Sequence, residues 1–90
     1  MNRLLKIINH YGINNQQRKL NEEVFELQEA ITTYEINKDD KQHLAEEIAD
    51  CEVLLAQFKA YYEIPSCTIN RFKEFKIDRQ LKRIENEVIK

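Results

Sequence analysis

The sequence is poor in the residues that build tight turns: it has one glycine and one proline in 90 residues, and no tryptophan. An all-β domain needs many such turns, so the composition argues against one. Long hydrophobic runs are also missing, because the longest, 53–56, has only four apolar residues, against the roughly 20 that cross a bilayer. Residues 1–12 are too polar and too short for a secretory signal. We therefore expect a cytoplasmic protein with no membrane partner.

Cysteine and positive charge are scarce as well. The two cysteines, Cys51 and Cys67, form no CxxC or Cys/His cluster, so we expect reduced, structural thiols. The 14 basic side chains are outnumbered by 16 acidic ones, and the net charge is −5 over residues 1–65 and +3 over residues 66–90. Proteins that bind polyanions usually carry a basic surplus, so nucleic acid is not an expected partner.

The apolar residues that are present, 42% of the chain, recur with helical spacing. This pattern predicts four helices, over residues 3–11, 15–34, 40–62 and 68–88, joined by short connections that are typical of antiparallel neighbours. Capping signals mark most of their ends: Asn2 and Gly12 around the first helix, Asn14 with Gln17, Asp39 with Gln42, and Pro65 before the last.

Two of the predicted helices carry apolar stripes with heptad-like steps of three and four. The stripes are Leu20, Val24, Leu27, Ile31 and Tyr34 in the second helix, and Leu44, Ile48, Cys51, Leu55, Phe58 and Tyr62 in the third. The third helix is also apolar on its opposite side, and a helix with two apolar sides is buried on both. The prediction is a single all-α domain, residues 1–90: an antiparallel four-helix bundle-like domain that is completed by homo-oligomerisation.

Two acidic segments, 20–26 and 44–50, share the pattern L-x-E-E-[VI]-x-[ED]. At about 100° per residue, the third and sixth residues after the leading leucine of each segment lie to one side of the apolar stripe. A two-fold axis relates antiparallel helices and carries equivalent flanks onto the same edge of the pair. The four carboxylates are therefore expected to meet at one edge and at one height: Glu23, Glu26, Glu47 and Asp50.

Four carboxylates this close repel one another and lose hydration, which is unfavourable unless a cation lies among them. An all-oxygen ligand set suits Mg²⁺ or Mn²⁺, whereas a di-iron bundle would need Glu-x-x-His motifs, which neither segment has. His43, one turn before Glu47, opens the third helix and is expected at the surface. On geometry alone, a charged and solvated edge without a metal stays open as the alternative, because closely spaced glutamates are common on exposed helices.

These residues also resemble a known family. The signature Glu22-Glu23-x-x-Glu26, followed in the next predicted helix by Glu47-x-x-Asp50, is similar to the EExxE…ExxD motif of MazG-like nucleotide pyrophosphohydrolases. The resemblance covers roughly residues 16–84. The run 76–84 is similar to the K-x-x-R element of short, phage-type members.

The resemblance implies an all-α, Mg²⁺-dependent enzyme, built as a homodimer or homotetramer. Its implied reaction is hydrolysis of a nucleoside triphosphate, NTP or dNTP, between the α- and β-phosphates, which gives the monophosphate and pyrophosphate. By motif position, Glu23, Glu26, Glu47 and Asp50 would be the metal ligands. Water bound to the ion could attack phosphorus as hydroxide, or one carboxylate, Glu23 or Glu26, could instead act as the catalytic base and accept the proton of the water. Glu22 and Glu46 match the first residue of each acidic pair, where a ligand role is less defined, and both are expected to point away from the cluster.

The leaving pyrophosphate needs positive charge, which the last predicted helix supplies. Lys76, Arg79 and Arg83 are its candidate phosphate-binding residues, since guanidinium groups suit bidentate phosphate contacts. Lys19, one turn before Glu23, is a further candidate. The alternative is that these cations only solvate a surface helix and offset the acidic ones.

Two other functions are compatible with the same residues. Phosphoribosyl-ATP pyrophosphohydrolase, in the same superfamily, has similar acidic motifs, although the K-x-x-R run favours the MazG-like branch. A non-catalytic helical interaction module would keep the fold without activity, and the intact Glu/Asp quartet speaks against it. No feature of the sequence fixes the base or the sugar of the substrate.

Overall fold

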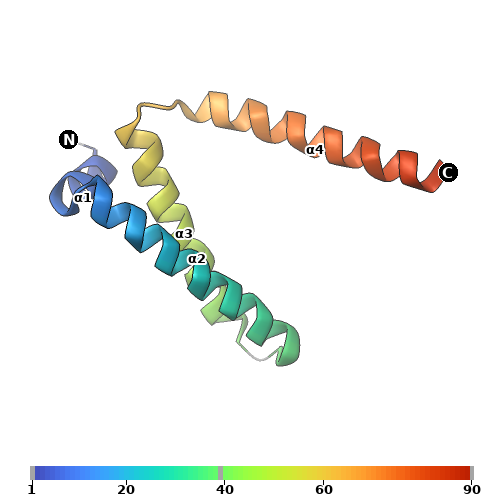
Figure 1. Ribbon diagram of the computed structural model, residues 1–90, viewed down its shortest axis with the longest axis horizontal. Helices are drawn as coiled ribbons and strands as arrows, with labels where there is room; N and C mark the ends of the chain where they lie inside the picture. Colours follow the sequence, from blue (N-terminus) through green and yellow to red (C-terminus); the bar gives the residue numbers. More distant parts are fainter. Residues whose placement is uncertain (1, 39, 90) are drawn as a thin grey trace.

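The computed structural model describes residues 2–38 and 40–89, and its ordered elements there are all helices (Figure 1). The helices are α1 (Arg3–Tyr11), α2 (Ile13–Ile36), α3 (Lys41–Tyr61) and α4 (Ser66–Ile89). Every helix end lies close to the position that the periodicity predicts. The all-α fold class is therefore confirmed. None of the described helices is both long enough and apolar enough to cross a lipid bilayer.

The ends of α1 follow the predicted capping signals. The Asn2 side-chain oxygen accepts a hydrogen bond from the Leu4 N–H at 2.7 Å, and the Gly12 N–H donates to the Ile8 carbonyl at 2.8 Å. The predicted cap at Asn14 is wrong, because α2 already begins at Ile13. Gly12, with φ 90°, turns the chain so sharply that the next helix starts directly after it.

The start of α3 is capped one residue later than predicted. The predicted cap, Asp39, lies outside the described residues. The Asp40 side chain accepts a hydrogen bond from the His43 N–H at 2.9 Å, which satisfies one of the free donors of the first turn. His43 itself is exposed, as expected.

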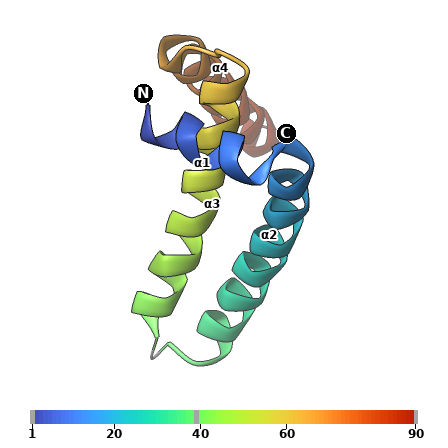
Figure 2. The same cartoon turned by 90° about the vertical axis from the view of Figure 1, so that its left-hand side faces the viewer.

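The helices α2 and α3 run antiparallel, side by side, and α1 packs across their open end (Figure 2). Four polar and three apolar side chains are buried on α2 and α3, and one apolar side chain, Ile8, is buried on α1. The buried polar residues are Gln16, Glu23, Glu47 and Gln57, and the buried apolar residues are Ile8, Ala30, Cys51 and Leu54. Two acidic side chains, Glu23 and Glu47, are therefore buried in the seam where α2 and α3 pack.

The predicted apolar stripes are only partly buried. Five of their residues are between 40% and 54% exposed: Val24, Ile31, Ile48, Leu55 and Tyr62. We call these five residues the apolar face. Val24 and Ile48 each follow a buried glutamate directly, so both fall on the same edge of the antiparallel pair. The contact between the helices is thus rotated by about one position from the predicted one.

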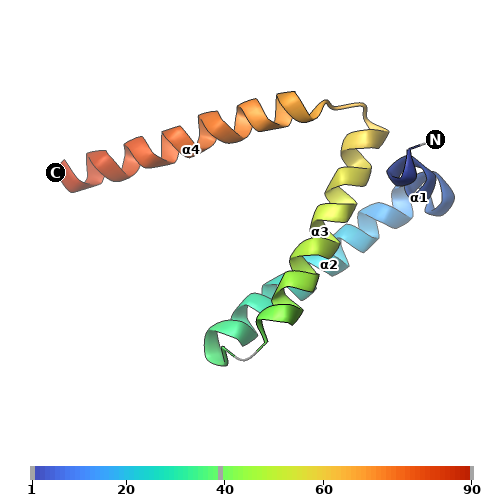
Figure 3. The same cartoon turned by 180° about the vertical axis from the view of Figure 1, so that it is seen from behind.

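α4 leaves the other helices instead of completing the bundle (Figures 1 and 3). It makes no packed interface with α1, α2 or α3, and the described part of the molecule is elongated, 53 × 36 × 20 Å. The prediction that the short connection after α3 returns the last helix as an antiparallel neighbour is therefore wrong within one chain, where the bundle has three helices.

Gly12 provides a direct test of the α1–α2 corner. Its φ of 90° and ψ of 148° belong to a region that is nearly exclusive to glycine, while a Cβ there would meet no atom within 4 Å. We expect Gly12→Ala to lower the free energy of unfolding by about 1–3 kcal/mol through backbone strain alone. Urea denaturation at a fixed protein concentration measures this, and an unchanged midpoint would contradict it.

Asn14→Ala is the matched control for this experiment. If Asn14 were the cap of α2, its removal would cost about 1 kcal/mol. Since the residue is exposed in the first turn of the helix, we expect a clearly smaller change.

Candidate metal centre

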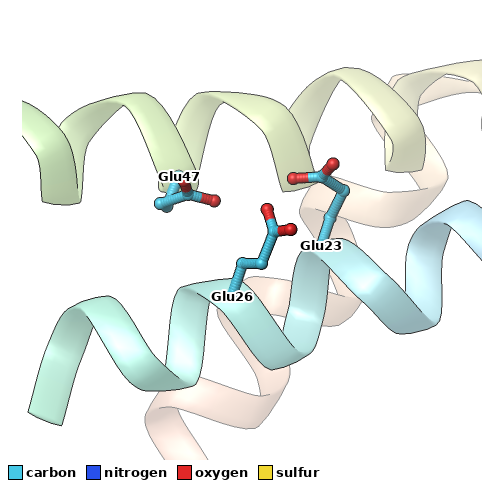
Figure 4. A group of neighbouring side chains, drawn as sticks. All are labelled: Glu23, Glu26 and Glu47. Atoms are coloured by element: carbon cyan, nitrogen blue, oxygen red, sulfur yellow. The ribbon is translucent and has the colours of Figure 1, made fainter.

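Three of the predicted ligands converge between α2 and α3 (Figure 4). Glu23 and Glu26 project from α2 and Glu47 from α3, and one carboxylate oxygen of each lies within 4.8 Å of the other two. Glu23 and Glu47 are buried in the seam, whereas Glu26 is exposed at its edge. The convergence of these three carboxylates follows from the antiparallel pairing that the sequence predicts.

The two buried carboxylates lack hydrogen bonds that their burial would normally require. Glu23 Oε2 and Glu47 Oε2 are inaccessible to solvent and have no hydrogen-bond partner among the described residues. Their other oxygens lie 3.1 Å from Lys19 Nζ and 3.9 Å from His43 Nε2. A buried, unpaired acceptor is costly, so these two oxygens fit a bound cation.

The electrostatics of the cluster point the same way. Repulsion by Glu23, desolvation and the charge of Glu47 raise the pKa of the Glu26 carboxyl above its ordinary value. Burial and the same carboxylates raise the pKa of the Cys51 thiol, and both cysteines are free. The site is therefore strongly negative, and its all-oxygen donor set suits Mg²⁺ or Mn²⁺.

Asp50, the fourth predicted ligand, lies outside this group of three. It is exposed and, with Glu22 and Glu23, lines an open pocket of about 780 Å³ beside the cluster. The volume is in the range of small-molecule sites, about 300–1,000 Å³. The remaining lining residues are Tyr11, Asn15, Gln16, Arg18, Lys19, Val53, Leu54 and Gln57.

The structure separates the predicted phosphate-binding residues. Lys19 lies in the pocket and pairs with Glu23, and this contact raises the pKa of the lysine. Lys76, Arg79 and Arg83 are exposed on α4, which packs against neither α2 nor α3. One chain alone therefore does not bring the cations of α4 to its carboxylates.

Sequence reasoning did not identify Gln57, a buried residue of the pocket. Gln57 is 3% exposed and accepts a hydrogen bond from Gln16 Nε2 at 2.7 Å across the α2–α3 seam. Gln16 lies about two helical turns before Glu23, and Gln57 lies about three turns after Glu47. The signal in the sequence was a glutamine on the side of each helix that faces the other helix. A buried amide needs a hydrogen-bond partner, so two such glutamines are expected to pair.

No protein-family model, curated protein or solved structure matches this chain. Any functional assignment therefore depends on the residues and their geometry.

The raised pKa of Glu26 predicts how the metal-free protein responds to pH. As the pH falls, the Glu26 carboxyl of the folded protein is protonated first, at its raised pKa. In the unfolded chain the same carboxyl is protonated only near its ordinary pKa, 4.5. Stability is thus gained on acidification and lost as the pH rises. In EDTA we expect Glu26→Gln to have a higher Tm than wild type at neutral pH. The difference should vanish once the pH falls below that ordinary pKa, and a pH-independent difference would exclude repulsion as its cause.

Proposed function

We propose that this protein hydrolyses nucleoside triphosphates, NTP or dNTP, to the monophosphate and pyrophosphate, with Mg²⁺ or Mn²⁺ as its cofactor. The observation that carries the proposal is the pair of buried oxygens, Glu23 Oε2 and Glu47 Oε2, which have no hydrogen-bond partner among the described residues and belong to carboxylates that converge with Glu26. Without a cation, an acidic site would repel a triphosphate. A divalent ion held by the carboxylates would remove this repulsion and let the anionic substrate bind.

The ion would be held by Glu23, Glu26 and Glu47, with Asp50 at the rim of the pocket. When bound, it would neutralise phosphate charge and favour attack by water on phosphorus. The reaction breaks the bond between the α-phosphorus and the oxygen that bridges to the β-phosphate, and the oxygen of water takes its place. Pyrophosphate leaves with the bridging oxygen.

Glu26 is the better placed of the two candidate bases for the proton that water loses. It is exposed at the edge of the cluster, where water can reach it, as a general base requires. Glu23 is buried and already paired with Lys19. Lys19 would move from this pair to a phosphate oxygen when substrate binds.

A panel of substrates tests the proposal. The purified protein is incubated with Mg²⁺ and, separately, with the common NTPs and dNTPs and with phosphoribosyl-ATP, and pyrophosphate release is measured. Turnover of NTPs or dNTPs is the expected result. Turnover of phosphoribosyl-ATP alone would instead assign the protein as a phosphoribosyl-ATP pyrophosphohydrolase. No turnover, together with no Mg²⁺ binding by calorimetry, would indicate a non-catalytic helical module.

We also propose that the protein is a homo-oligomer, a dimer or a tetramer. The support is the apolar face, whose five large side chains are 40–54% exposed in one chain. Large apolar side chains that share an exposed face are typical of interaction sites. Sedimentation velocity tests the proposal, and a monomer at every concentration would contradict it.

A further inference from the structure

α4 is a 24-residue helix that has no packed interface with the other described helices of its own chain. Every described side chain from 70 to 87 is exposed, and the helix stands away from the other three (Figure 3). Its large apolar side chains are more than half exposed: Phe72, Phe75, Ile77, Leu81 and Ile84. Most helical stability in proteins comes from packing of an apolar side, so α4 needs a surface to cover it.

The elbow between α3 and α4 holds α4 away from its own chain. The Ile64 N–H donates to the Lys59 carbonyl at 2.9 Å, and the Glu63 N–H donates to the Ala60 carbonyl at 3.2 Å. With Glu63 at φ 55°, this is the hydrogen-bonding pattern of a Schellman motif. Pro65 follows with a fixed φ. These hydrogen bonds and the fixed backbone angle of Pro65 restrict the direction in which α4 leaves α3, and they disfavour a return of α4 along its own α3.

The corner at this elbow is open and apolar. A hollow of about 560 Å³ lies there, lined by residues from both helices. They are Glu52, Leu55, Phe58, Lys59, Tyr62, Ile64, Ile69 and Lys73. Leu55 and Tyr62 belong to the apolar face, so the hollow and that face form one surface. On α4, the side of Ile69 and Lys73 continues at helical spacing to Ile77 and Ile84.

The charges on these elements identify a second copy of the chain as the occupant. α4 carries six basic and four acidic side chains, a net charge of +2, whereas α2 and α3 carry net charges of −3 and −2. Each copy therefore offers a basic helix without a partner and an acidic helix pair with an uncovered apolar face. In a dimer with a two-fold axis, α4 of each copy would cover the apolar face of the other copy, and the two contacts would be identical.

The spacing from the elbow adds a match in register. Asp50 and Glu47 lie about three and four helical turns before the end of α3, and Lys76 and Arg79 lie about three and four turns after the start of α4. At about 1.5 Å per residue, both pairs are about 15–21 Å from the elbow. A helix α4 that lies antiparallel along α3, elbow beside elbow, brings its cations level with the carboxylates.

We propose that two copies exchange their α4 helices, each α4 lying along α3 of the other copy and supplying Lys76 and Arg79 to the phosphates bound there. The inference rests on the proposed function for the identity of that ligand. It adds that each site is composite, with carboxylates from one copy and cations from the other.

Complementation between two inactive variants tests the exchange. Glu47→Gln removes the carboxylate site, and the double variant Lys76→Ala, Arg79→Ala removes the cations. In a co-refolded equal mixture, half of the dimers are mixed and each holds one complete site, so we expect about a quarter of wild-type activity from random pairing in a two-fold dimer. Activity no higher than that of the separate variants would overturn the exchange while the hydrolase stands. A wild-type protein without turnover would overturn the proposed function instead.

Cross-linking tests the exchange without any activity. Isotopically heavy and light copies are co-refolded and treated with a carbodiimide, which joins an amine to a carboxylate in direct contact. We expect Lys76 linked to Glu47 or Asp50 in peptide pairs that combine one heavy and one light copy. Links confined to heavy–heavy and light–light pairs would overturn the proposal, as would the absence of these links.

Sedimentation of two α4 variants completes the test. Leu81→Asp places a charge on the apolar side of α4, and Asn86→Asp adds the same charge on a different side. Because the described part of α4 forms no packed interface with α1, α2 or α3, both variants should retain α1–α3. We expect Leu81→Asp to sediment as a monomer and Asn86→Asp as a dimer. A dimer in both, or a monomeric wild type, would overturn the exchange.

Discussion

Replacement of Glu47 by glutamine is expected to lower kcat/KM for a nucleoside triphosphate by about 10³-fold or more. A divalent ion contributes several kcal/mol of charge stabilisation in such reactions, and about 4 kcal/mol corresponds to about 10³ in rate. Glutamine keeps the shape of the side chain but loses the charge that holds the ion. Glu47 is only 9% exposed in the α2–α3 seam, so we expect no exposed side chain to take over its role as a ligand.

Glu46→Gln is the matched control, because Glu46 precedes Glu47 on the same helix and is exposed. We expect it to retain activity close to wild type. Circular dichroism should show the same helical content in both variants. Full turnover by Glu47→Gln, or an equal loss in Glu46→Gln, would show that the buried carboxylates are not the site of the reaction.

Mg²⁺ is expected to raise the Tm of the wild-type protein by about 10–20 °C at a concentration near 100 times its dissociation constant. Binding at that level stabilises a folded state by about 2.7 kcal/mol, and each kcal/mol shifts the Tm of a domain of this size by about 4–8 °C. The shift arises because the ion relieves repulsion among carboxylates that each keep one buried oxygen without a hydrogen-bond partner, Glu23 Oε2 and Glu47 Oε2. Differential scanning calorimetry at fixed protein concentration measures it.

Glu23→Gln should remove most of this shift. In metal-free buffer the same variant should melt above wild type, since it has one buried charge less beside Glu47 and Glu26. Glu29→Gln, an exposed change on the same helix, should leave both values unchanged. A Glu23→Gln variant that keeps the full Mg²⁺ shift would exclude this residue as a ligand.

The heptad-like spacing correctly placed four helices, because spacing and capping act within a few residues along the chain. The matched acidic segments also predicted that Glu23, Glu26 and Glu47 meet, since the short connection between α2 and α3 makes the two helices antiparallel and places these residues at the same height. The spacing did not identify which residues face the seam. Val24 and Ile48 are more exposed than the glutamates that precede them, because the rotation of one helix against the other is set by the tertiary contact and not by the spacing of apolar residues along the chain.

The order of residues along the chain was enough to predict the helices, their polarity and the meeting of three carboxylates, because all of these follow from local periodicity and one short connection. The folded arrangement was needed to show that Asp50 stays at the rim, that Gln16 and Gln57 pair across the seam, and that α4 stands apart from the carboxylates. The reason is that these outcomes depend on how far one helix rotates against another and on the hydrogen bonds at the elbow, which no pattern along the chain encodes.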